Sequence, residues 1–259
     1  IYTADAARHN GIWSGPRYRI DVPGKSGGII EIDEPYIKLD GLQINVSGSG
    51  SSGSAIRFNS TSHGYVSNSV IQNTNTDNDT AGIFINSGGG YFRIWNNIVY
   101  RADNLERGNG IYNKSHAGNA YVYNNTVYGY ASGFKGSSGH DTIFANNIAY
   151  GNANNYNGEA DASPLSSYNL SGPGHADAPG SNPINSATVE FADEANNDFH
   201  ITKDSAARDA GADLYDDANL NVRTDIDGEA RGETGFDIGA DEYAGGTGIG
   251  DESTDAFAR

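Results

Sequence analysis

Apolar residues recur at fixed positions around an asparagine through the middle of the chain. The segments SNSVIQ (67–72), WNNIVY (95–100), YVYNNTVYGY (121–130) and ANNIAY (145–150) share this arrangement. We treat six residues as equivalent anchors, with separations of 27, 28, 28, 22 and 23 residues: Gly41, Asn68, Asn96, Asn124, Asn146 and Asn169. Apolar residues stand two positions before (Leu39, Val66, Ile94, Val122, Phe144) and three positions after (Ile44, Ile71, Val99, Val127, Ala149). Asn169 fits less well, because Ser167 stands two positions before it.

This repeat predicts an all-β parallel solenoid in which each period is one coil. Short strand-like runs at such a period, without a helical pattern between them, are typical of that fold. The anchor is expected at a turn, where asparagine tolerates unusual backbone angles. Its side-chain amide can also bond the equivalent residue one coil away, which satisfies buried polar groups. We therefore predict an asparagine ladder through Asn68, Asn96, Asn124, Asn146 and Asn169.

A second strand precedes four of the anchors. The runs are AIRFN (55–59), GIFIN (82–86), GIYNK (110–114) and GFKGS (133–137), and GGIIEID (27–33) is expected in an earlier coil. Residues 73–82 and 101–110 are the expected long loops, and long loops on one side of a solenoid often form its functional groove. We expect a lead-in or cap at 1–26, coils at 27–170, a closing coil and cap at 171–243, and a flexible tail or linker at 244–259.

Composition and charge limit the classes of function. Hydrophobic residues make up 36% of the chain, and 35 glycines suit a fold with many turns and a thin core. The absence of cysteine excludes disulfides, thiolate metal sites and a cysteine nucleophile. The net charge of −17 argues against nucleic acid as a partner, and no apolar run is long enough to predict membrane insertion.

The C-terminal region carries a resemblance to a known class. It contains SAARDAG (205–211), DIDGEAR (225–231) and DIGADE (237–242). Together with the coil repeat, this ending resembles the bacterial extracellular right-handed parallel β-helix repeat proteins, although Ala206 and Arg208 depart from the usual residues. The resemblance implies a single right-handed parallel β-helix and an extracellular or cell-surface location. We expect Arg231 to pair with Asp237 or Glu242 in a structural role.

Several aromatic and charged residues are expected to point outward, because strand side chains alternate. One column holds Lys38, Tyr65, Arg93, Tyr121 and Ile143; a second holds Asp40, Ser67, Trp95, Tyr123 and Ala145; a third holds Tyr100, Tyr128 and Tyr150. Three explanations remain open for these aromatics. A loop or the C-terminal segment covers them, a second copy of the chain packs on them, or they form a platform for stacking sugars.

Candidate catalytic residues follow from the lyases of the β-helix class, in which Lys or Arg commonly acts as the base. Lys114 and Lys135 fall on the same strand of successive coils, followed by His116 and His140. Arg93, Arg101 and Arg107 are candidates for binding acidic groups, and Asp77 and Asp79 are candidate calcium ligands. The repeat singles out no carboxylate pair of the kind that a glycoside hydrolase needs.

The leading hypothesis is a non-catalytic surface, adhesive or fibre-forming protein that uses its outward aromatic face for self-association or glycan contact and requires no cofactor. The alternatives are a polysaccharide lyase with calcium as cofactor, acting on uronate-containing glycans near Lys114 and Lys135, and a phage-type spike.

Overall fold

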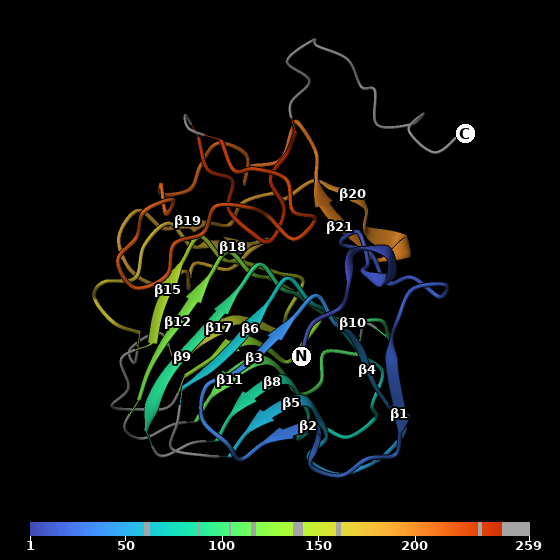
Figure 1. Ribbon diagram of the computed structural model, residues 1–259. Helices are drawn as coiled ribbons and strands as arrows, with labels where there is room; N and C mark the ends of the chain where they lie inside the picture. The colour runs from blue at the N-terminus through green and yellow to red at the C-terminus, as the bar shows by residue number, and fades with distance from the viewer. Residues whose placement is uncertain are drawn as a thin grey trace.

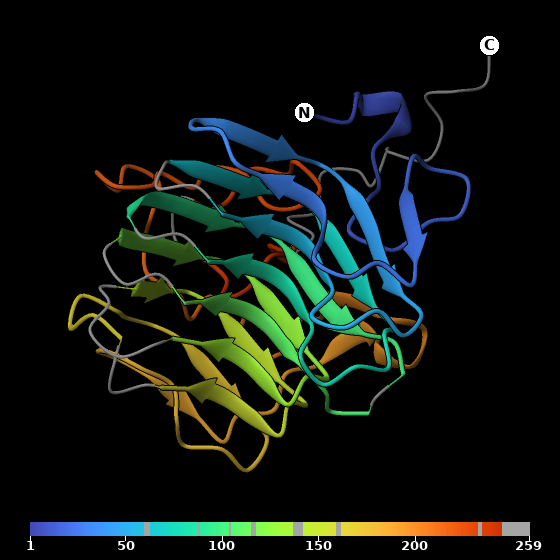
Figure 2. The ribbon, with the colours of Figure 1, turned by 90° about the horizontal axis from the view of Figure 1, so that it is seen from below.

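The chain folds into a right-handed parallel β-helix. The structure is a computed structural model, and it describes residues 1–59, 63–86, 89–103, 105–114, 118–136, 142–158, 162–232 and 235–244. Successive coils follow chain order along the axis, from blue to yellow in Figure 2. Among these residues, no helix is long and apolar enough to cross a membrane. The predicted fold class is confirmed.

Three parallel sheets form the sides of the coils (Figure 1). Sheet A contains β3 (Ile37–Asp40), β6 (Gly64–Ser67), β9 (Gly90–Trp95), β12 (Gly118–Tyr123) and β15 (Thr142–Ala145). Sheet B contains β1 (Ile20–Pro23), β4 (Gln43–Ser47), β7 (Val70–Asn73), β10 (Ile98–Arg101), β13 (Thr126–Tyr128), β16 (Ile148–Tyr150), β18 (Leu170–Gly172) and β19 (Ile184–Asn185). Sheet C contains β2 (Gly28–Ile32), β5 (Ser54–Phe58), β8 (Ala81–Ile85), β11 (Asn109–Asn113), β14 (Ser132–Lys135) and β17 (Asn154–Asn157). The predicted strand before each anchor is thus the sheet C strand of its coil.

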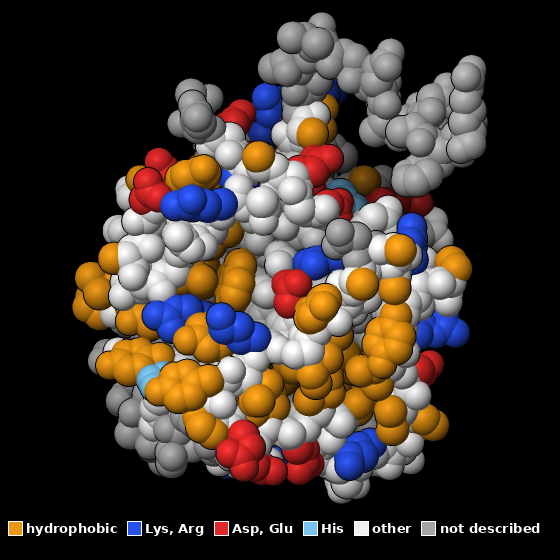
Figure 3. Space-filling view, in the orientation of Figure 1, with side chains coloured by type: hydrophobic (Ala, Val, Ile, Leu, Met, Phe, Trp, Pro, Cys, Tyr) orange, Lys and Arg blue, Asp and Glu red, His pale blue; other side chains and the backbone are white. Residues whose placement is uncertain are grey.

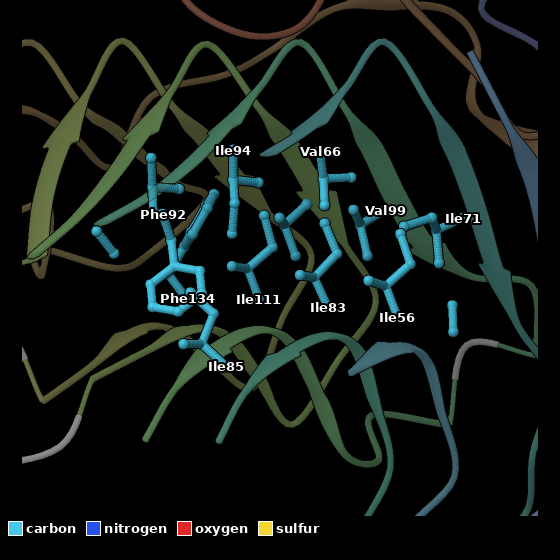
Figure 4. Packing of buried hydrophobic residues seen from close by; sticks show 14 of the residues in the cluster. Ile56, Val66, Ile71, Ile83, Ile85, Phe92, Ile94, Val99, Ile111 and Phe134 are labelled. Atoms are coloured by element: carbon cyan, nitrogen blue, oxygen red, sulfur yellow. The ribbon is translucent and has the colours of Figure 1, made fainter. Parts of the chain in front are cut away.

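The core is a set of apolar rows that run along the axis (Figure 4). Ile56 pairs in register with Ile83, and Ile83 pairs with Ile111, so one side chain lies directly above the next. All ten apolar positions predicted to face inward are buried in this cluster. Their burial supplies the main driving force for stacking, since each fully buried aliphatic side chain contributes roughly 1.5–3 kcal/mol.

The turn from sheet A to sheet B uses two residues per coil. The predicted ladder named the first of them in four coils and the second, Asn169, in the fifth. Asn68, Asn96, Asn124 and Asn146 adopt left-handed backbone angles (φ 48° to 54°), as their role in a turn suggested. The continuous buried ladder instead runs one residue later, with amide-to-oxygen distances of 2.9, 3.0 and 3.0 Å along Asn97, Asn125, Asn147 and Asn169. Asn169 therefore corresponds to Asn147, and Tyr168 (φ 52°) occupies the left-handed position of that coil.

The first residue of each asparagine pair points out of the coil and makes different contacts. Asn96 donates to the side-chain oxygen of Asn68 (3.1 Å), and Asn68 donates to Asp40 (2.7 Å). Asn124 donates instead to the backbone oxygens of Asp237 and Gly239 (both 3.1 Å). The predicted ladder residues thus serve partly as an anchor for the C-terminal segment.

The C-terminal segment lies along the flank of the solenoid. Strands β18 and β19 continue sheet B as the expected closing coil. The chain then forms the antiparallel hairpin β20 (Phe191–Asp193) and β21 (Asp198–Ile201), separated by the short 3₁₀ helix η3 (Glu194–Asn196). The described residues between 190 and 243, part of the expected closing coil and cap (171–243), return along the turns between sheets A and B, as the orange and red trace in Figure 1 shows. The expected tail beyond residue 244 lies outside the described residues.

The N-terminal residues complete the opposite end. The chain begins with a parallel bridge between Tyr2 and Asp40 and the 3₁₀ helix η1 (Asp5–Ala7), after which β1 pairs with β4. These contacts extend sheets A and B by one row before the first full coil.

Candidate functional site

The C-terminal segment covers much of the predicted aromatic face. The side chains of Tyr121 and Tyr123 point outward from sheet A as expected, yet they are buried against Leu214, Leu220, Val222 and Phe236. Trp95 is half-buried against the same cluster. Of the three explanations left open for these aromatics, cover by the C-terminal segment is therefore the one observed for Tyr121 and Tyr123.

The column on sheet B is covered in the same way. The ring of Tyr100 is fully buried and lies 5.2 Å from that of Phe199 on β21, and the ring of Tyr128 lies 4.9 Å from it. Tyr150 contacts Phe191 on β20 at 5.6 Å. The Tyr128 hydroxyl also donates to Glu194 (2.6 Å). The hairpin β20–β21 thus makes these tyrosines part of the packing.

An aromatic row on sheet A remains open. The ring centroids of Tyr36 and His63 lie 4.8 Å apart, and those of His63 and Tyr91 lie 5.2 Å apart with the planes nearly parallel at 11°. Tyr36 is 65% exposed and Tyr91 is 45% exposed. Sequence reasoning missed these three residues, although a signal was present, since each stands five positions before its anchor.

Two cations border this row. Arg93 lies between the rings of Tyr65 and Tyr121, at 5.6 and 5.4 Å, and Lys38 lies 5.2 Å from the ring of Tyr65. The Nε atom of Arg93 donates to the backbone oxygen of Asn219 at 2.5 Å, so the C-terminal segment fixes its position. We name the hollow formed by Tyr36, Lys38, His63, Tyr65, Tyr91 and Arg93 the sheet A groove; Figure 3 shows hydrophobic and cationic side chains gathered on this face.

Lys114 and Lys135 do lie together, in a second hollow on sheet C. We name it the sheet C groove; it has a volume of about 240 Å³, and its lining includes Arg57, Asp79, Phe84, Tyr112, Lys114 and Lys135. His116 and His140, the other two catalytic candidates, lie outside the described residues. The structure therefore brings together the two predicted lysines and adds Arg57, which the sequence reading did not select.

The other predicted arginines serve the loops. Arg101 is fully buried, and its guanidinium pairs with Asp103 (2.6 Å) and donates to the backbone oxygen of Asn75 (2.7 Å). Because this guanidinium is fully buried and bonded within the protein, the interpretation of Arg101 as a binder of acidic groups on a ligand is wrong. Arg107 donates to the backbone oxygen of Thr76 at 2.6 Å.

The candidate calcium ligands shape a turn. The side-chain oxygen of Asp77 accepts from the backbone nitrogen of Asp79 (2.7 Å), and Asn75 caps Asp77 in the same manner (2.8 Å). This use of Asx turns is a usual role for Asp and Asn in loops. Of the two carboxylates, that of Asp79 reaches the sheet C groove.

A partly buried cluster of charges joins the hairpin to the C-terminal motif. His200 bonds Asp198 through Nδ1 (2.5 Å) and Asp227 through Nε2 (2.9 Å). Burial disfavours the charged ring, but the hydrogen bond to Asp227 and the nearby carboxylates outweigh it and raise the pKa of His200 to about 10. The ligand atoms of His200, Asp227 and Asp241 lie within 4.8 Å of one another, a spacing that could hold a metal ion. Both ring nitrogens of His200 are engaged by carboxylates from different parts of the segment, so we assign this cluster a structural role in joining the hairpin to the C-terminal motif.

A scan against protein-family models gives no match, and no curated protein is significantly similar in sequence. The function is therefore argued from the two grooves and their chemistry.

Proposed function

We propose that this protein is an extracellular, non-catalytic protein that contacts a glycan through the sheet A groove. The observation that carries the proposal is the exposed row Tyr36–His63–Tyr91. Flat rings pack against the apolar faces of pyranose sugars, and contiguous exposed aromatics are uncommon without a binding role. The extracellular location rests on the resemblance described above.

The arrangement of the row favours an extended ligand. The three rings belong to successive coils, whose strands are spaced at ~4.8 Å, so the row follows the solenoid axis. Lys38 and Arg93 lie beside it and supply hydrogen-bond donors for sugar hydroxyl or acidic groups. A polysaccharide chain laid along the axis would meet rings and donors together.

Replacement of the two exposed tyrosine rings of the row tests this proposal. We expect the double variant Tyr36→Ala/Tyr91→Ala to lose about tenfold or more in affinity on a panel of immobilised polysaccharides, since each ring contact contributes on the order of 1 kcal/mol. The matched control is Tyr2→Ala/Tyr18→Ala, which removes two tyrosines that are 78% and 56% exposed elsewhere. Equal binding by the double variant and the wild type would refute the assignment.

A second copy of the chain is the competing occupant of the same row. Light scattering of the purified protein distinguishes it. If the wild type forms an oligomer that dissociates in the Tyr36→Ala/Tyr91→Ala variant, and if no glycan binds, then the row serves self-association and not glycan contact.

A polysaccharide lyase is the second candidate, favoured by the meeting of Lys114 and Lys135 in one groove. It predicts that unsaturated oligosaccharides are released from a polyuronate, and that the Lys114→Gln/Lys135→Gln variant abolishes this release. Intact polymer after prolonged incubation, with and without calcium, would exclude it for the substrates tried.

A further inference from the structure

The outer face of sheet C carries a row in which two cations enclose two stacked rings. Arg57 pairs in register with Phe84, Phe84 with Tyr112, and Tyr112 with Lys135. The rings of Phe84 and Tyr112 are stacked at 5.1 Å with an interplanar angle of 25°. The guanidinium carbon of Arg57 lies 5.1 Å from the Phe84 centroid, and Nζ of Lys135 lies 4.8 Å from the Tyr112 centroid. Cation–π attraction thus fixes both charges in place.

Carboxylates form no ion pair with the cations of this groove among the described residues. Glu31 pairs in register with Arg57, but its carboxylate accepts from the backbone nitrogen of Gly28 (2.8 Å). Among the residues that the structure describes, the ion pairs involve other cations, and none includes Arg57, Lys114 or Lys135. The chain has 33 acidic residues against 16 Lys and Arg, so carboxylates are abundant on its surface. Three cations in one groove without such a partner can pair with an anion from solution, and an anion between positioned cations forms strong hydrogen bonds.

The rest of the lining suits a sugar. Ser52, Asn86 and Asn109, which are exposed or half-buried, place hydroxyl and amide groups in the same groove as the lysines. The exposed carboxylate of Asp79 also lies there; it accepts hydrogen bonds from hydroxyls and repels a second anionic group. A ligand with both hydroxyl and acidic groups satisfies this lining better than a simple anion does.

The shape of the row indicates a linear ligand and argues against nucleic acid. Arg57 and Lys135 stand on strands three steps apart, or ~14 Å along the axis. Single-stranded nucleic acids bind to proteins mainly by stacking bases on free aromatic faces. In this row the faces of Phe84 and Tyr112 are directed at each other and at the two cations.

We propose that the sheet C groove binds the carboxylate or sulfate groups of a linear acidic polysaccharide, with Arg57, Lys114 and Lys135 supplying the positive charge. The site lies on a different sheet from the sheet A groove, and it requires neither the function proposed there nor cleavage of the polymer.

The test measures binding by isothermal titration at constant ionic strength. The probes are polygalacturonate for carboxylates, heparin for sulfates, fully methyl-esterified pectin as the neutral counterpart, and a single-stranded DNA oligonucleotide. We expect the Lys114→Gln/Lys135→Gln variant to bind the preferred acidic glycan about 100-fold more weakly, or about tenfold per lysine. Lys25→Gln/Lys203→Gln removes two exposed lysines elsewhere and should stay within about twofold of the wild type. Lys135→Arg keeps a cation over the Tyr112 ring and should retain binding, and thermal denaturation confirms that each variant is folded.

The outcomes separate the alternatives. Preference for polygalacturonate or for heparin identifies carboxylate or sulfate as the group bound. The proposal is overturned if no acidic glycan binds, if both double variants weaken binding equally, or if DNA binds as tightly as the glycans. Variants at Tyr36 and Tyr91 should leave this binding unchanged, so failure here is distinct from failure of the sheet A proposal.

Discussion

The Nη2 atom of Arg231 donates to the side-chain oxygen of Asn96 at 3.1 Å, across 135 positions of the chain. The same guanidinium pairs with Glu242 (3.0 Å) and donates to the backbone oxygens of Gly239 and Ala240 (2.9 and 3.1 Å). The predicted structural pairing of Arg231 with Glu242 is thus present, and it is fully buried on the arginine side. This arginine joins the C-terminal motif to a turn of the solenoid.

Arg231→Met is expected to destabilise the protein by about 3–5 kcal/mol, because it leaves the carboxylate of Glu242 buried without its cation. The half-buried Trp95 lies under the C-terminal segment, so its fluorescence in a denaturant titration measures the change. The control is Arg223→Met, which removes an exposed pair with Asp216 and should cost less than about 1 kcal/mol. Equal losses in the two variants would contradict the role given to Arg231.

The internal asparagine ladder is expected to contribute strongly to stability. Asn125 bonds Asn147 above it, and its amide also donates to the backbone oxygens of Ile94 and Tyr123 (2.9 and 3.0 Å). Asn125→Ala removes these bonds and also the acceptor of the buried backbone N–H of Asn97 (3.1 Å), so we expect a loss of about 2–4 kcal/mol in the free energy of unfolding. Asn154→Ala, at an exposed site with one hydrogen bond to Ala131, should change stability by about 0.5 kcal/mol or less. A mild effect at Asn125 would show that the ladder tolerates gaps.

The left-handed turn position offers a stabilising substitution. Tyr168 adopts φ 52° where four other coils have asparagine. Because the left-handed region costs most residues roughly 1–2 kcal/mol and asparagine less, Tyr168→Asn should raise the free energy of unfolding by about 0.5–1 kcal/mol. Asn124→Val at the equivalent turn should do the reverse. Thermal denaturation of both variants tests this, and a destabilised Tyr168→Asn would mean that the tyrosine ring makes a compensating contact.

Stability should fall as pH rises above neutrality. The pKa of His200 is raised from 6.5 to about 10, so its protonated form stabilises the fold fully below pH 6.5, and this contribution is lost as pH rises through about 10. Burial also raises the pKa of Asp241 from 3.8 to about 7. Because this carboxyl ionises more readily in the unfolded chain, the free energy of unfolding also falls as pH rises from 3.8 to 7.

His200→Asn is the variant that tests this dependence. His200→Asn should lower the melting temperature at pH 6.5, and it should make the fall in melting temperature between pH 6.5 and 10 smaller than in the wild type. His175→Asn changes a half-buried histidine elsewhere and should leave that fall as large as in the wild type. A slope unchanged by His200→Asn would assign the pH dependence to other groups.

Much of the fold was predictable because a solenoid repeats the same local requirement in every coil. The inward positions Leu39 and Ile44, and their equivalents, were identified from their spacing alone and are all buried. The ladder was placed one residue too early, because Asn96 and Asn97 have the same chemistry and only the backbone turn decides which side chain points inward. The row Tyr36–His63–Tyr91 also repeats, with each residue five positions before its anchor, but the prediction used only positions closer to the anchor.

The amino-acid sequence by itself determined the coil, the inward rows and the outward direction of the aromatic columns, since these follow from alternation and period. Only the tertiary structure decided which outward rings stay accessible. Tyr121, Tyr123 and Tyr100 are covered by residues that include Phe199, Leu214 and Phe236, which lie far from them in sequence and carry no periodic signal that marks their destination. The sheet A groove is therefore defined jointly by the repeat and by the path of the C-terminal segment, because burial there depends on contacts between parts of the chain that are distant in sequence.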